Sequence, residues 1–121
     1  MRILLVDDSS TMRRIERNTL EKLGHTDVTE AEDGADALKK LAAGKFDLIL
    51  MDWNMPNMTG IEALKKIKAD ETLKAIPVIM VTSESEKTRI IEALQSGAAN
   101  YVVKPFQPET LKEKITAVIK A

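Results

Sequence analysis

The chain has 121 residues, of which 44% are hydrophobic and 31% charged, and its formal net charge is −1. This size and balance are typical of one globular domain with a sizeable core, here residues 1–121. The charge excludes the basic excess of a nucleic-acid-binding protein, and the lack of cysteine excludes disulfides and thiolate metal sites. Apolar runs of four or five residues are too short for a membrane span or a secretory signal, so we expect a cytoplasmic monomer.

Strand-like and helix-like segments alternate along the chain. Short apolar or β-branched runs predict strands at residues 3–6, 27–31, 48–51, 78–82 and 100–103. Apolar residues at helical spacing mark one face of a helix within each of 12–23, 61–67 and 111–119, and two more helices fit 35–43 and 86–96. Strict alternation of this kind predicts an α/β domain with a parallel sheet covered by helices on both faces. The strands at 3–6, 48–51 and 78–81 are continuously apolar, as strands buried on both faces should be.

Turn and cap residues agree with these elements. Asp33 suits the N-cap of the second helix, and Pro108 suits the first turn of the last helix. Thr59 and Glu62 have the spacing of a capping box. Three glycines follow predicted helix ends, where a C′ residue needs a positive φ: Gly24, Gly44 and Gly97.

Polar side chains follow the carboxyl ends of four predicted strands: Asp7 and Asp8, Asp52, Thr82, and Lys104. Ligands of open α/β sheets bind outside the carboxyl ends, where the strand order reverses. If the order is 2-1-3-4-5, the three aspartates meet there. With Lys104 their formal charge is −2, which one divalent cation neutralises. An oxygen-only ligand set favours Mg²⁺, Mn²⁺ or Ca²⁺ over zinc, and Mg²⁺, which keeps several waters, suits a shallow site.

The same group of residues has the composition of a phosphoryl-transfer site. An aspartate can act as a nucleophile and form an acyl phosphate. A metal ion and Lys104 would neutralise charge on the transferred group, and the Thr82 hydroxyl can hydrogen-bond one of its oxygens. We therefore predict that Asp52 is phosphorylated.

Three stretches, V-D-D-S-S-T-M-R-R, D-W-N-M-P-N-M and N-Y-V-V-K-P-F, resemble the response-regulator receiver domain, and in particular its chemotaxis regulators. The resemblance runs from Arg2 to about Ile119. It covers the family pattern of an acidic pair after strand 1, an aspartate after strand 3, a threonine after strand 4 and Lys104-Pro105 after strand 5. It implies a flavodoxin-like doubly wound (βα)5 fold with five parallel strands in the order 2-1-3-4-5.

The resemblance also implies a role for each matching residue. Asp52 would accept a phosphoryl group from a sensor histidine kinase or a small donor, and Lys104 and Thr82 would contact that group. The ligands of Mg²⁺ would be Asp7, Asp8, Asp52 and the backbone carbonyl of Asn54. Tyr101 would move with Thr82 and alter the face formed by helix 4, strand 5 and helix 5. The residues that tune dephosphorylation would be Asn54 and Glu84.

On this interpretation the chain is a phosphorylated switch and not an enzyme with a separate substrate, although it catalyses its own phosphorylation and slow dephosphorylation. It would act by docking to another protein, for a chemotaxis regulator the flagellar motor switch, and a phosphatase is a possible further partner. No nucleic-acid or membrane partner is expected. Thr59 replaces the aspartate usual before Gly60 in the family, and it leaves a good helix cap.

Three alternatives remain open at this point. A flavodoxin-type FMN protein shares the predicted fold and would place its phosphate near Ser9, Ser10 and Thr11, but the preceding aspartates would repel that phosphate. A dehalogenase-type phosphatase also uses a strand-end aspartate, but it needs a second aspartate where this chain has Asn54. A stand-alone receiver in a phosphorelay outside chemotaxis fits the same motifs.

Overall fold

The computed structural model describes residues 1–53, 55, 58–82, 87–103 and 106–119, with the backbone alone for 87–89. Strands and helices alternate throughout: β1 (Ile3–Val6), α1 (Ser10–Lys22), β2 (Val28–Ala31), α2 (Gly34–Ala43), β3 (Leu48–Asp52), α3 (Gly60–Ala69), β4 (Val78–Thr82), α4 (Lys87–Gln95), β5 (Asn100–Val103) and α5 (Pro108–Val118). All the predicted elements are present. The second strand begins one residue later than predicted, and the third strand extends through Asp52, which pairs with Val81.

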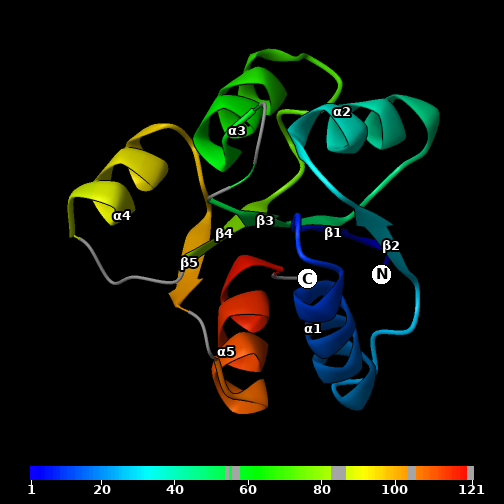
Figure 1. The fold of residues 1–121 in the computed structure, drawn as a ribbon. Helices are drawn as coiled ribbons and strands as arrows, with labels where there is room; N and C mark the ends of the chain where they lie inside the picture. Colours follow the sequence, from blue (N-terminus) through cyan, green and yellow to red (C-terminus); the bar gives the residue numbers. More distant parts are fainter. Residues whose placement is uncertain (54, 56–57, 83–86, 104–105, 120–121) are drawn as a thin grey trace.

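The strands form one parallel sheet in the order β2-β1-β3-β4-β5, which confirms the predicted fold class. Helices α1 and α5 cover one face of this sheet, and α2, α3 and α4 cover the other (Figure 1). Such an arrangement follows from parallel strands, whose crossover helices must lie on the sheet faces.

The core is divided between the two faces because side chains alternate along each strand. Ile3 and Leu5 point to the α1–α5 side, whereas Leu4 and Val6 point to the α2–α4 side. β3 and β4 alternate in the same way, so the three central strands are buried on both faces. The continuous apolar character of these strands is thus explained by their central position.

Side chains cap the N-termini of α1, α2 and α3. Ser9 accepts a hydrogen bond from the Met12 N–H (3.2 Å), and Asp33 accepts one from the Asp36 N–H (2.7 Å). Thr59 accepts from the Glu62 N–H, while the Thr59 hydroxyl donates to the Glu62 carboxylate. Pro108 is the first residue of α5. The predicted caps at positions 33 and 59 are confirmed.

One prediction about the glycines is wrong. Gly24 and Gly97 have φ values of 93° and 107°, as expected for C′ residues. Gly44, however, is extended, with φ of −155°, because the chain leaves α2 directly toward β3 without a left-handed residue. No helix among the described residues combines the length and the apolar character that crossing a membrane requires.

Candidate functional site

The carboxyl ends of β1, β3 and β4 bring the predicted site residues to one edge of the sheet. Val6 pairs with Met51, and Asp52 pairs with Val81, so Asp7 is level with Asp52, and Thr82 is the next residue along β4. The Asp7 N–H donates to the Ala31 carbonyl (3.1 Å), which continues the pairing of β1 with β2 past the strand end. The sheet register therefore decides which polar residues meet.

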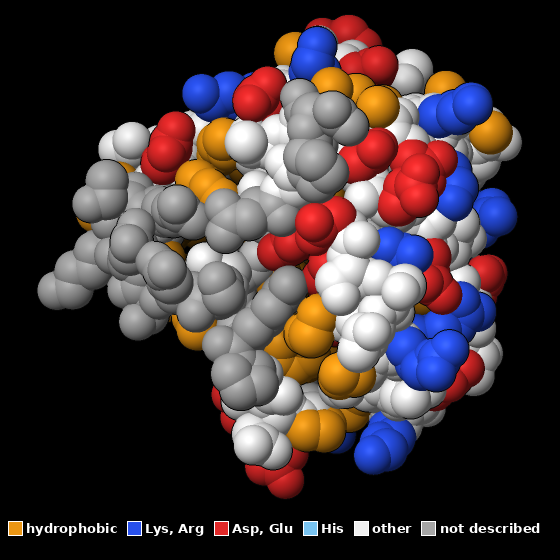
Figure 2. Space-filling model, viewed as in Figure 1, with side chains coloured by type: hydrophobic (Ala, Val, Ile, Leu, Met, Phe, Trp, Pro, Cys, Tyr) orange, Lys and Arg blue, Asp and Glu red, His pale blue; other side chains and the backbone are white. Residues whose placement is uncertain are grey.

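Asp7, Asp8 and Asp52 form an acidic cluster. One carboxylate oxygen from each residue lies within 4.8 Å of the other two. Asp7 and Asp52 are buried, with 1% and 6% of their surface exposed, and Asp8 is exposed. Acidic side chains also gather near the middle of the face drawn in Figure 2, with Lys and Arg mostly toward its right-hand edge.

The acidic cluster has the size and chemistry of a divalent cation site. Oxygens on opposite sides of Mg²⁺ lie about 4.2 Å apart, and those around Ca²⁺ about 5 Å, so one ion can contact all three carboxylates after small side-chain movements. Three like charges in a partly buried site repel one another, and a bound cation would offset that repulsion. The donor set consists of hard oxygens, which suits Mg²⁺, Mn²⁺ or Ca²⁺.

The Asp7 carboxylate is oriented by the start of α1. Its Oδ1 accepts a hydrogen bond from the Ser9 N–H (2.9 Å), and Ser9 in turn caps the helix through its hydroxyl. The same short turn thus begins the helix and sets the rotation of a carboxylate in the acidic cluster.

Thr82 and Tyr101 line a small cavity behind the acidic cluster. Thr82 is the buried last residue of β4, and the half-buried Tyr101 lies on the neighbouring β5. The cavity, of about 10 Å³, is also lined by Trp53, Met80, Ile90 and Ala93. The Lys114 ammonium lies 4.6 Å from the centre of the Tyr101 ring, so α5 contacts this tyrosine as well.

Gly60 is a site residue that the sequence analysis missed. A Cβ at this position would lie 2.1 Å from the backbone oxygen of Asp52 and 3.0 Å from the Met80 side chain. The Gly60 N–H also donates to the Trp53 carbonyl (2.9 Å). The first residue of α3 is thus packed directly on the end of β3, and only glycine fits there. The glycine after the Thr59 cap was visible in the sequence, but the contact itself was not.

Several predicted site residues lie outside the described residues: Asn54, Glu84, Lys104 and Pro105. Their assigned roles therefore stay predictions. The described part of the predicted site consists of Asp7, Asp8, Asp52, Thr82 and Tyr101, all at or near the carboxyl edge of the sheet.

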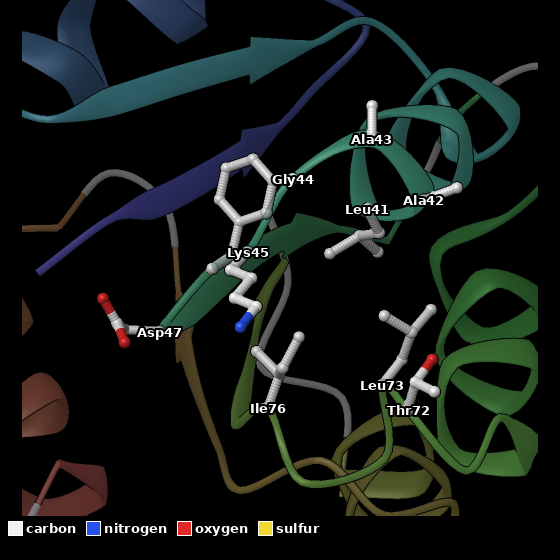
Figure 3. Close-up of a pocket in the computed structure, with 10 residues that line it drawn as sticks. Leu41, Ala42, Ala43, Gly44, Lys45, Asp47, Thr72, Leu73 and Ile76 are labelled. Carbon is white, nitrogen blue, oxygen red and sulfur yellow. The ribbon is translucent and has the colours of Figure 1, made fainter.

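A second hollow lies at the opposite end of the sheet, between the end of α2 and the segment before β4 (Figure 3). Its volume of about 570 Å³ would suit a small ligand. Its lining is mainly apolar, with Leu41, Phe46, Leu73 and Ile76, and its charged members are Lys45 and Asp47. Because this lining contains no cluster of acidic or nucleophilic side chains, the carboxyl edge is the better candidate site.

The chain belongs to the response regulator receiver domain family, whose model matches residues 3–116. Among its relatives are chemotaxis proteins named CheY. The chain is 54% identical over 120 residues to the chemotaxis protein CheY of Pseudomonas aeruginosa, covering 99% of this chain and 97% of that one. It is 52% identical to the chemotaxis protein CheY1 of Helicobacter pylori, covering 98% and 97%.

Solved structures agree with this assignment. The chain superposes on the chemotaxis response regulator CheY4 of Vibrio cholerae with a TM-score of 0.89 at 38% identity, covering 98% of each chain. A putative response regulator from Chloroflexus aurantiacus gives a TM-score of 0.91 at 26% identity, covering 97% of this chain and 95% of that one. The chain is thus a CheY-like receiver domain, which sets aside the flavodoxin-type and dehalogenase-type alternatives.

Proposed function

We propose that this receiver domain is a switch driven by Mg²⁺-dependent phosphorylation of Asp52. The observation that carries the proposal is the convergence of three carboxylates within 4.8 Å at the carboxyl edge of the sheet, with Thr82 ending the next strand. Asp7, Asp8 and Asp52 would hold the ion, together with the backbone carbonyl of Asn54.

The reaction is the transfer of a phosphoryl group to the Asp52 carboxylate. A carboxylate oxygen attacks phosphorus, the bond from phosphorus to the donor breaks, and its electron pair stays on the donor. For a sensor histidine kinase the leaving atom is an imidazole nitrogen, and for acetyl phosphate it is an acyl oxygen. When bound, Mg²⁺ supplies positive charge that offsets the charge on the transferred group.

The other residues of the site would hold the phosphoryl group and report its presence. The Thr82 hydroxyl would donate a hydrogen bond to one phosphoryl oxygen, and the Lys104 ammonium would pair with another. Movement of Thr82 would change the cavity that it shares with Tyr101, and with it the surface formed by α4, β5 and α5. Asn54 and Glu84 would tune the rate at which water removes the group.

The output of this switch is docking to a protein partner. Relatives of 52–54% identity that are named chemotaxis proteins support the flagellar motor switch as that partner and a chemotaxis kinase as the donor. The exposed apolar residues Ile91 and Leu94 of α4 suit such docking.

The first experiment follows Trp53 fluorescence during addition of Mg²⁺ and then acetyl phosphate, with mass spectrometry at the end point. Trp53 is the only tryptophan, it adjoins Asp52, and it lines the cavity behind Thr82. We expect a Mg²⁺-dependent change, a second change with the phosphodonor, and a gain of about 80 Da, one phosphoryl group, that is lost again with time.

Two aspartate variants locate the phosphorylated residue. Asp52→Asn should remain folded and gain no mass, because an amide is not a nucleophile of this kind. Asp27→Asn, which changes an exposed aspartate at the other end of the sheet, should be labelled like the unmodified protein. Stoichiometric labelling of Asp52→Asn would show that phosphorylation takes place elsewhere.

A further inference from the structure

Arg13 contacts the backbone of Asp7, a member of the acidic cluster, although the sequence analysis gave Arg13 no role. From α1, its Nη1 donates a hydrogen bond to the backbone oxygen of Asp7 (2.5 Å), and its Nε donates to Glu30 Oε1 in β2 (2.9 Å). Only 16% of the Arg13 side chain is exposed. One guanidinium thus ties helix α1, strand β2 and the backbone of a candidate metal ligand together.

Further contacts hold this arrangement in place. The other oxygen of Glu30 accepts a hydrogen bond from Arg17 Nη1 (2.7 Å), and the Lys40 ammonium donates to the backbone oxygen of Glu30. Glu30 is therefore anchored by groups from α1 and α2. Burial raises the pKa of Glu30, but the hydrogen bonds and charges of Arg17 and Arg13 outweigh it and hold the pKa below its usual value. The carboxylate that anchors Arg13 is thus ionised at neutral pH.

We propose that Arg13 is a positioning residue for the metal site, which acts through the backbone of Asp7 and is itself aligned by Glu30. Within the described part of the chain, at least three hydrogen bonds hold Asp7: its N–H donates to Ala31, its carbonyl accepts from Arg13, and its Oδ1 accepts from the Ser9 N–H. The first two hydrogen bonds hold the backbone of Asp7 in place. The third then fixes the orientation of its carboxylate. This inference rests on the proposed function, because it concerns the affinity of the acidic cluster for Mg²⁺.

Removing Arg13 should change Mg²⁺ affinity in opposite directions through the loss of its charge and through the loss of its hydrogen bond to Asp7. Its positive charge near three carboxylates disfavours a bound cation, so loss of the charge alone would tighten Mg²⁺ binding. Loss of the hydrogen bond to Asp7 would instead loosen a ligand. Substitutions of residues that orient metal ligands typically weaken metal affinity by about 10–100-fold. A fall in Mg²⁺ affinity would therefore indicate the positioning role of Arg13, and a rise would indicate the effect of its charge alone.

Arg17 provides a matched control. It has the same charge, lies one turn further along α1 and binds the same Glu30 carboxylate, but its hydrogen bond goes to Glu30 and not to Asp7. Arg13→Met and Arg17→Met each remove one charge and one bond to Glu30. They differ in the bond to the Asp7 backbone.

The test is a Mg²⁺ titration followed by Trp53 fluorescence in both variants, with the amide NMR signal of Ser9 recorded without metal. We expect Arg13→Met to weaken Mg²⁺ binding about tenfold or more and to shift the Ser9 signal, because its N–H reports on the Asp7 carboxylate. Arg17→Met leaves the contacts of Glu30 with Arg13 and Lys40 in place. It should therefore bind Mg²⁺ about as tightly as the unmodified protein, or slightly more tightly, and leave the Ser9 signal in place.

The outcomes separate this inference from the proposed function. If the unmodified protein shows no response to Mg²⁺, the proposed function fails, and the positioning role fails with it. If the unmodified protein responds but Arg13→Met binds Mg²⁺ equally or more tightly, the positioning role alone is overturned. Equal weakening in Arg13→Met and Arg17→Met would also overturn it, since that would indicate a general effect of the Glu30 contacts.

Discussion

Replacing Gly60 by alanine should damage both the stability of the domain and its acidic cluster. The added Cβ would lie 2.1 Å from the backbone oxygen of Asp52, whereas ordinary van der Waals contact begins at 3.4 Å. The two groups must therefore separate by 1.3 Å (3.4 − 2.1). Because the obstructing atom is backbone, no side-chain rotation relieves the contact, and α3 must move relative to the end of β3.

The magnitude follows from two opposing effects. Overpacking costs about 1–3 kcal/mol, and a contact with backbone belongs near the upper end of that range. Alanine is favoured over glycine within a helix by about 0.5–1 kcal/mol. We therefore expect the free energy of unfolding to fall by about 2 kcal/mol. A displacement near 1 Å also exceeds the tolerance of about 0.5 Å for a preorganised site, so Mg²⁺ affinity should fall as well.

Urea unfolding followed by circular dichroism measures the stability, and Trp53 fluorescence measures Mg²⁺ binding. Gly44→Ala is the matched control, because Gly44 is extended and the atoms nearest to its Cβ would be those of the Arg2 side chain, at 3.2 Å and beyond. That variant should be as stable as the unmodified protein, or more stable by up to about 1 kcal/mol. If Gly60→Ala matched Gly44→Ala in both measurements, the close packing of α3 on Asp52 would be refuted.

Three further predictions concern stability. Lys68→Met removes the ammonium that donates to two backbone carbonyls of the loop after α3, at 2.9 Å each, and should cost about 1–3 kcal/mol in urea unfolding. Asp33→Ala removes the N-cap of α2 and should cost about 0.5–2 kcal/mol, and no loss would contradict the cap. The pKa of Glu30 is held below its usual value, so its stabilising effect is present above about pH 4.5 and is lost as the pH falls through the lower folded pKa. Glu30→Gln should therefore be less stable at neutral pH and lose less stability on acidification.

Local patterns in the sequence were sufficient to predict the elements and most of the strand ends. Continuous apolar runs marked the central strands, and Asp33 and Thr59 marked helix starts through contacts within one turn. These features depend on residues close together in the chain, so they can be predicted from the sequence alone. The strand order came from the family resemblance, because spacing alone does not say which strands are neighbours.

The tertiary structure decided everything that depends on distant parts of the chain meeting. Sequence analysis named Asp7, Asp8 and Asp52, but their approach to within 4.8 Å is a consequence of sheet register. The extended Gly44 results from the direction in which the chain must travel to β3. The contact of Gly60 with Asp52, and that of Arg13 with Asp7, have no local sequence signal. Residues that meet across a fold leave no periodic pattern, because their spacing in the chain is set by the intervening elements.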